Sequence, residues 1–209
     1  MYLGIDLGTS SVKAVLVDER GMLQASASRP LAVQRPMPNW SEQAPASWWI
    51  ATDEAVKALP GSHRAGVRAI GLSGQMHGAV LLHRELRPVR PAILWNDGRA
   101  HAECLAIEAL VPAARQRSGS AIMAGFTAPK LLWLARNEPA AFARVSHVML
   151  PKDFVRMRMT GELATDMSDA SGTAWLNVGE RRWDDELVSA SGVRLDLSLI
   201  HFGYARQDR

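Results

Sequence analysis

The amino terminus limits the possible folds more than any other part of the chain. Three runs with strand character, Tyr2–Leu7, Val12–Val17 and Met22–Arg29, follow one another with only short polar connections between them. A parallel crossover needs about a dozen connecting residues or more, whereas a hairpin needs only a tight turn. The spacing therefore predicts a three-stranded antiparallel meander at the start of the chain.

Helical and extended segments alternate after this meander. The first helix is expected from Pro45 to Leu59, because proline is tolerated in a first turn and Pro60 with Gly61 ends the helix. Further strands are expected at Arg68–Leu72, Ala79–Leu82 and Ala92–Trp95, and further helices at Arg99–Leu110, Pro129–Asn137 and Asp153–Met159. This order predicts a mixed α/β domain in which helices flank the sheet.

Composition excludes several functional classes. The formal net charge of +3 arises from 24 basic and 21 acidic residues that are scattered along the chain, which argues against nucleic acid or an anionic membrane as a partner. No apolar run approaches the roughly 20 residues that a membrane span needs, and no signal peptide is recognisable. The single Cys104 excludes an internal disulfide and fits a reducing compartment, so we expect a cytoplasmic protein with this thiol buried.

The end of the first strand carries a candidate phosphate and metal site. Asp6 is an acidic residue in an otherwise apolar strand, and Gly8 allows the tight turn that follows. Thr9 and Ser10 add hydroxyl groups to this turn, and Lys13 lies close enough to reach the same phosphates as a point charge. A carboxylate beside such donors suits a hydrated magnesium ion next to a phosphate chain. On these residues alone, an ordinary hairpin turn remains the alternative.

A second polar cluster follows the predicted strand at Arg68–Leu72. Gln75 and His77 offer directional hydrogen bonds, and Met76 offers apolar contact, which is the combination that polyol recognition requires. A histidine at a strand end can equally be a solvated residue without a ligand. A third cluster contains Trp95, whose ring can pack against a sugar, and Asp97, for which capping of the next helix is the alternative.

Taken together, these segments resemble the FGGY carbohydrate kinases, and within them the kinases of xylulose. The resemblance extends over residues 4–173 in the family order. The matching segments are Asp6–Ser10, Asn39–Gln43, Gln75–Gly78, Pro91–Asp97, Gly125–Lys130, Leu150–Asp153, Thr160–Glu162 and Thr165–Thr173.

The resemblance implies a ribonuclease H-like domain of the actin-like ATPase superfamily, which normally faces a second such domain across a nucleotide-binding cleft. It implies transfer of the γ-phosphoryl group of ATP to D-xylulose, giving D-xylulose 5-phosphate. Asp6 is then expected to hold Mg²⁺ through water, and Gly8, Thr9, Ser10 and Lys13 to face the phosphates.

The resemblance further implies that Met76 and His77 contact the ketose, with Gln75, Trp95 and Asp97 as neighbours. The family's catalytic base is an aspartate in a Gly-Gly-Asp turn, and this sequence contains no Gly-Gly pair. We therefore expect the chain to stop before the catalytic aspartate and before the second domain, and to be inactive by itself.

The expected organisation is a sugar-binding amino-terminal domain over residues 1–195 and an unmatched tail over residues 196–209. The oligomeric state is not determined by the sequence, and a homodimer of the full-length form stays open. Two other functions also stay open: a kinase of ribulose, gluconate or glycerol, and a non-catalytic actin-like or sugar-binding module.

Overall fold

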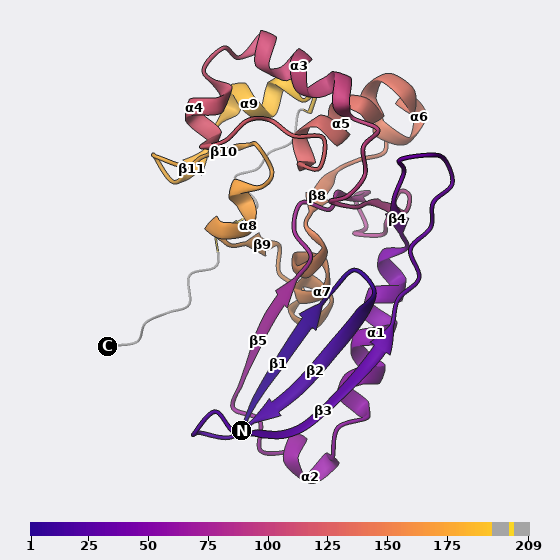
Figure 1. The fold of residues 1–209 in the computed structure, drawn as a ribbon, viewed down its shortest axis with the longest axis vertical. Helices are drawn as coiled ribbons and strands as arrows, with labels where there is room; N and C mark the ends of the chain where they lie inside the picture. The colour runs from indigo at the N-terminus through magenta and orange to yellow at the C-terminus, as the bar shows by residue number, and fades with distance from the viewer. Residues whose placement is uncertain (194–200, 203–209) are drawn as a thin grey trace.

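A four-stranded sheet forms one half of the computed structural model, which describes residues 1–193 and 201–202 (Figure 1). Strands β1 (Tyr2–Leu7), β2 (Ser11–Val17) and β3 (Leu23–Pro30) form the predicted antiparallel meander. Strand β5 (Ala69–Gly74) pairs with β1 in parallel, giving the order β3-β2-β1-β5. The connection to β5 contains helix α1 (Pro45–Lys57), as a parallel crossover requires.

One face of this sheet is buried beneath helices. Leu3, Ile5 and Leu7 alternate along β1 into a core that α1 and α7 (Pro151–Thr160) complete. The side chains between them, including Asp6, lie on the opposite face, where Asp6 is exposed. The strict alternation of β1 therefore directs one carboxylate away from the core, at the end of the central strand.

A second group of helices packs around a separate core beyond the strand ends (Figure 1). Helix α3 (His101–Leu110) packs against α5 (Thr127–Asn137) within it. The other helices on this side are α4 (Ala114–Ser118), α6 (Pro139–Phe142), α8 (Met167–Ser171) and α9 (Asp185–Ala190). Helix α2 (Gly61–Arg64) follows α1 at the opposite end of the sheet (Figure 1). Two-stranded ladders join β4 (Glu42–Gln43) to β7 (Ala92–Ile93), β6 (Val80–Leu82) to β8 (His147–Met149), β9 (Ala164–Thr165) to β12 (His201–Phe202), and β10 (Leu176–Asn177) to β11 (Arg182–Trp183).

The predicted elements are present, and their bounds shift by a few residues. The clearest difference lies at Ala92–Trp95, where the strand ends at Ile93 and Trp95 lies in the turn that follows. Cys104 is buried, as predicted. Over the described part of the chain, no helix has the length and apolar character needed to cross a membrane. The predicted tail, residues 196–209, lies outside the described residues except for the two residues of β12.

Candidate active site

The two predicted polar segments meet at one edge of the sheet. Strands β1 and β5 run parallel, so their carboxyl ends lie side by side, with Asp6 opposite Ser73 in the register. The backbone N–H of Gln75 donates to the carbonyl of Leu7 at 2.7 Å and continues the pairing beyond both strands. The turn after β1 and the turn after β5 therefore share one site.

A hydrogen-bond chain connects this edge to the third polar cluster. The indole N–H of Trp95 donates to the hydroxyl of Thr9 at 3.0 Å, and that hydroxyl donates to Oε1 of Gln75 at 3.3 Å. Trp95 is 43% exposed, so its ring borders the solvent while its N–H is fixed. Three segments that were predicted separately are joined by side-chain contacts.

A residue without a predicted role, Gln43, lies behind this chain of contacts. Its Nε2 donates to the carbonyl of Thr9 at 2.7 Å, and its Oε1 accepts from Nε2 of Gln75 and from Nε1 of Trp48, each at 2.9 Å. The residue is fully buried. Gln43 belongs to a segment that resembles the family, but nothing in a polar loop sequence indicates that one glutamine is buried.

Asp6 and Lys13 face the open side of the sheet. They are cross-strand partners, both are exposed, and among the described residues neither makes an ion pair within 4.0 Å. A hollow of about 430 Å³ lies beside them, lined also by the glycine pair Gly4 and Gly71 and by Ser73. An unpaired carboxylate beside an open hollow fits a hydrated Mg²⁺ ion with attached phosphates.

The turn between β1 and β2 has little steric freedom. A Cβ atom on Gly8 would lie 3.0 Å from the carbonyl oxygen of Ser11, so a larger residue would force the turn open. The hydroxyl of Thr9 is already occupied by Gln75 and Trp95, whereas Ser10 is exposed. Of the two hydroxyls predicted to face phosphate, that of Ser10 makes no hydrogen bond to another residue in the described part of the chain.

His77 occupies an unusual backbone conformation on the sugar-facing turn. Its φ is 61°, in the left-handed region that few non-glycine residues adopt. The imidazole ring lies 4.8 Å from the ring of Phe126, and its Nδ1 would be 2.1 Å from a Cβ atom on Gly172. Burial lowers the pKa of His77, Lys130 lowers it further, and the nearby backbone of Gly172 opposes both effects. The imidazole is therefore neutral at pH 7. The side chain of the neighbouring Met76 is 48% exposed.

The carboxylate of Asp97 is fully paired with other groups of the protein. One carboxylate oxygen accepts from the backbone N–H of Ser41 at 2.6 Å, and both oxygens bind Arg99. Its side chain has no exposed surface. The helix-cap alternative is wrong, because α3 begins at His101 and has Ala100 at its N-cap without a side-chain bond.

The partners of Asp97 fix the loop that presents Trp95. Arg99 also donates to Glu42 of strand β4 at 2.7 Å, and its guanidinium lies 3.6 Å from the ring centroid of Trp40. Glu42 pairs with Arg90 as well. These buried charges hold the loop against β4, so Asp97 shapes the site from behind it.

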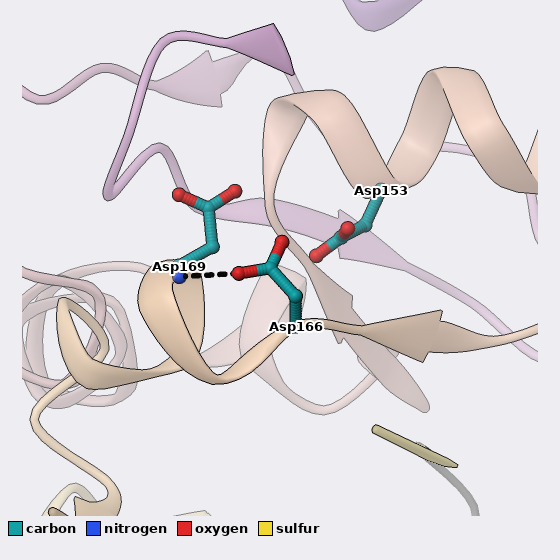
Figure 2. A group of neighbouring side chains, drawn as sticks. All are labelled: Asp153, Asp166 and Asp169. Carbon is teal, nitrogen blue, oxygen red and sulfur yellow. Dashed lines mark hydrogen bonds between the residues drawn. The ribbon is translucent and has the colours of Figure 1, made fainter. Parts of the chain in front are cut away.

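Three carboxylates in a second location form a cluster that could suggest a metal site. Asp153, Asp166 and Asp169 present oxygens within 4.8 Å of one another, and Asp166 accepts the backbone N–H of Asp169 at 3.0 Å (Figure 2). The ammonium of Lys152 already pairs with all three, at 2.6, 2.9 and 3.2 Å respectively. Burial lowers the pKa of Lys152, but the three carboxylates outweigh it and raise the pKa overall. Lys152 therefore occupies the place of a cation in this cluster.

Comparison with known proteins agrees with this geometry. The profile of the FGGY family of carbohydrate kinases, N-terminal domain, matches residues 1–203. A xylulose kinase of Klebsiella pneumoniae is 56% identical over 198 residues, covering 94% of this chain and 41% of that protein. A xylulose kinase of Escherichia coli (strain K12) is 54% identical over 197 residues, with the same coverage. The crystal structure of a xyloylose kinase from Brucella ovis has a TM-score of 0.90 at 50% identity, covering 95% of this chain and 42% of that chain.

The fold and the polar edge of its sheet define a sugar-kinase domain of the actin-like ATPase type. The chain belongs to the FGGY family of carbohydrate kinases. It spans about 41% of the length of the curated relatives that it matches.

Proposed function

We propose that this chain is the sugar-binding domain of an ATP-dependent kinase that converts D-xylulose to D-xylulose 5-phosphate. The observation that carries the proposal is the contact of Thr9, from the phosphate-facing turn, with both Gln75 and Trp95 from the sugar-facing segments. A phosphoryl acceptor and a phosphate chain have to lie within bonding reach, and this arrangement brings their two predicted sites together. The xylulose kinases among its relatives support the choice of sugar.

Mg²⁺ would be held through water by Asp6, and it would neutralise the charge that develops on the transferred phosphoryl group. Lys13 and Ser10 would approach the phosphates from the same open face, and Gly8 would admit them close to the backbone. The hydroxyl of Thr9 would act indirectly, by fixing Trp95 and Gln75.

The sugar would lie against Met76, Trp95 and His77, the first two giving apolar contact along its carbon chain. A neutral His77 both donates and accepts hydrogen bonds, which suits a ligand made of hydroxyl groups. Gln75 would hold the turn in register. Asp97 would contribute only through the Trp95 loop, because its carboxylate is buried and paired.

Three further expectations belong to this proposal. The acceptor of the hydroxyl proton is an aspartate outside this chain, and the sugar-binding domain is residues 1–195. The protein works in the cytoplasm, in keeping with its single buried thiol.

The first experiment is a titration of the 209-residue chain with D-xylulose, D-ribulose, glycerol and gluconate, following tryptophan emission. We expect a saturable change with D-xylulose that is strongly reduced in Trp95→Phe. Saturation by another sugar in place of D-xylulose would reassign the substrate. A folded chain that responds to ATP and to none of the sugars would favour the non-catalytic module.

Catalysis is tested in a chimera in which residues 1–203 replace the matching part of the Klebsiella pneumoniae xylulose kinase. We expect xylulose-dependent ADP release from the chimera, its loss in Asp6→Ala, and negligible turnover by the 209-residue chain alone. A chimera that folds and binds ATP but does not phosphorylate xylulose would contradict the proposal.

A further inference from the structure

Lys130 is a fully buried lysine in the first turn of α5. Its ammonium donates to the backbone carbonyl of His77 at 2.9 Å and to that of Gly125 at 2.6 Å. Burying an ammonium group is strongly unfavourable unless its hydrogen bonds are satisfied. The side chain is therefore held in a specific arrangement, in contrast to a lysine whose stem merely covers apolar surface.

The first acceptor belongs to a residue in a strained backbone conformation. His77 has a φ of 61°, and its carbonyl accepts a second hydrogen bond, from the hydroxyl of Thr127 at 3.2 Å. Both donors come from the start of α5. A left-handed non-glycine residue persists only when its surroundings impose the conformation, and two donors on one carbonyl provide such a constraint.

The second acceptor belongs to a close contact with the Trp95 loop. A Cβ atom on Gly125 would lie 2.4 Å from the carbonyl oxygen of Trp95, so the two backbones pack directly on each other. Lys130 thus connects the turn that carries His77 to the segment on which Trp95 rests. Burial lowers the pKa of Lys130 to about 7, Asp97 in the Trp95 loop raises it in part, and Arg99 lowers it.

We propose that Lys130 is a positioning residue of the sugar site, which fixes the left-handed conformation of His77 and its distance from the Trp95 loop. The consequence for the sugar rests on the proposed function, whereas the consequence for the backbone does not. Removing the ammonium should release the His77 carbonyl, let the turn relax toward an ordinary conformation, and move the imidazole away from its contact with Phe126.

Lys130→Met is the direct test, because methionine keeps most of the apolar stem and lacks the donor. Leu134→Ala is the matched control: Leu134 lies one turn further along the same helix and is equally buried, so its truncation weakens the core without touching His77. The first readout is the set of backbone ¹³C chemical shifts of His77 in the 209-residue chain. We expect the left-handed signature to be lost in Lys130→Met and retained in Leu134→Ala.

The second readout is the dissociation constant for D-xylulose. We expect it to rise about tenfold or more in Lys130→Met, as for the loss of one hydrogen bond to a charged group. Propylamine added to Lys130→Ala should restore part of the affinity, which a merely structural loss would not allow. Thr127→Val, which removes the other donor to the same carbonyl, provides a milder variant if Lys130→Met does not fold.

Unchanged His77 shifts in both Lys130→Met and Thr127→Val would overturn the proposal. So would a Leu134→Ala chain that loses the left-handed signature to the same extent. If the wild-type chain does not bind D-xylulose, the proposed function fails on that measurement, and the chemical shifts still decide the role of Lys130.

Discussion

The indole N–H of Trp95 reaches the hydroxyl of Thr9 across 86 positions of sequence, at a donor–acceptor distance of 3.0 Å. Thr9 belongs to the turn after the central strand, and Trp95 belongs to a loop beyond the sheet. Because Thr9 also binds Gln75, one hydroxyl joins the phosphate-facing and sugar-facing segments. A change at any of these three residues is therefore expected to affect the other two.

Gln43 is predicted to be the largest single contributor to the rigidity of this edge. Gln43→Leu removes the amide group, and it leaves the Thr9 carbonyl, the Trp48 indole and Nε2 of Gln75 without this partner. We expect the free energy of unfolding to fall by about 2–4 kcal/mol, from the polar groups left unsatisfied. Urea denaturation measures this loss. Gln24→Leu is the control at an exposed position, where less than about 0.5 kcal/mol is expected, and equal losses would contradict the prediction.

Gly172→Ala is predicted to disturb His77 without disturbing the fold. The backbone of Gly172 has a φ of −79°, which alanine adopts readily, but the new Cβ would lie 2.1 Å from Nδ1 of His77. The ring has to rotate away, and we expect affinity for D-xylulose to fall about tenfold while the far-ultraviolet circular dichroism is unchanged. Gly179→Ala is the control, since its nearest atom there is 3.7 Å away. Wild-type affinity in Gly172→Ala would show that the position of the imidazole does not matter.

Sugar affinity should decrease in acid because His77 becomes charged. Its pKa lies below the ordinary value of 6.5, through burial and then through Lys130, so the neutral form persists somewhat below pH 6.5. The stability that His77 contributes is present above pH 6.5 and is lost as the pH falls through the lowered pKa. Titration of the His77 ring by NMR alongside the dissociation constant checks this. An affinity that falls at a pH where the His77 ring stays neutral would assign the effect to another group.

Lys152→Met is predicted to be strongly destabilising at neutral pH. It leaves Asp153, Asp166 and Asp169 close together without their shared cation, and breaking a buried pair in this way costs about 3–5 kcal/mol. The loss should shrink as the pH falls, because protonation removes the repulsion between the carboxylates. Lys57→Met is the matched control: Lys57 pairs with Asp53 at the same 2.6 Å but on the surface, where such pairs contribute about 0–1 kcal/mol. Urea denaturation of both variants at pH 5 and pH 7 measures their free energies of unfolding. A loss of stability in Lys152→Met that does not change with pH would argue against a charge effect.

Local sequence patterns determined the elements of this fold. The meander over residues 2–30 follows from short turns between β-rich runs, and the bounds of α1 follow from proline at its start and Pro60–Gly61 at its end. These features depend on interactions between residues that are close in sequence or repeated at a fixed period.

Only the tertiary structure decided which side chains are free to act. Asp6 and Asp97 are both acidic residues near strand ends, yet Asp6 faces an open hollow and Asp97 is fully paired with Ser41 and Arg99. The sequence also did not predict three further features: the burial of Gln43, the two carbonyl acceptors of Lys130, and the pairing of Lys152 with three aspartates. Each depends on hydrogen bonds or ion pairs whose partners are brought together by packing, and no local periodicity encodes where such partners will lie.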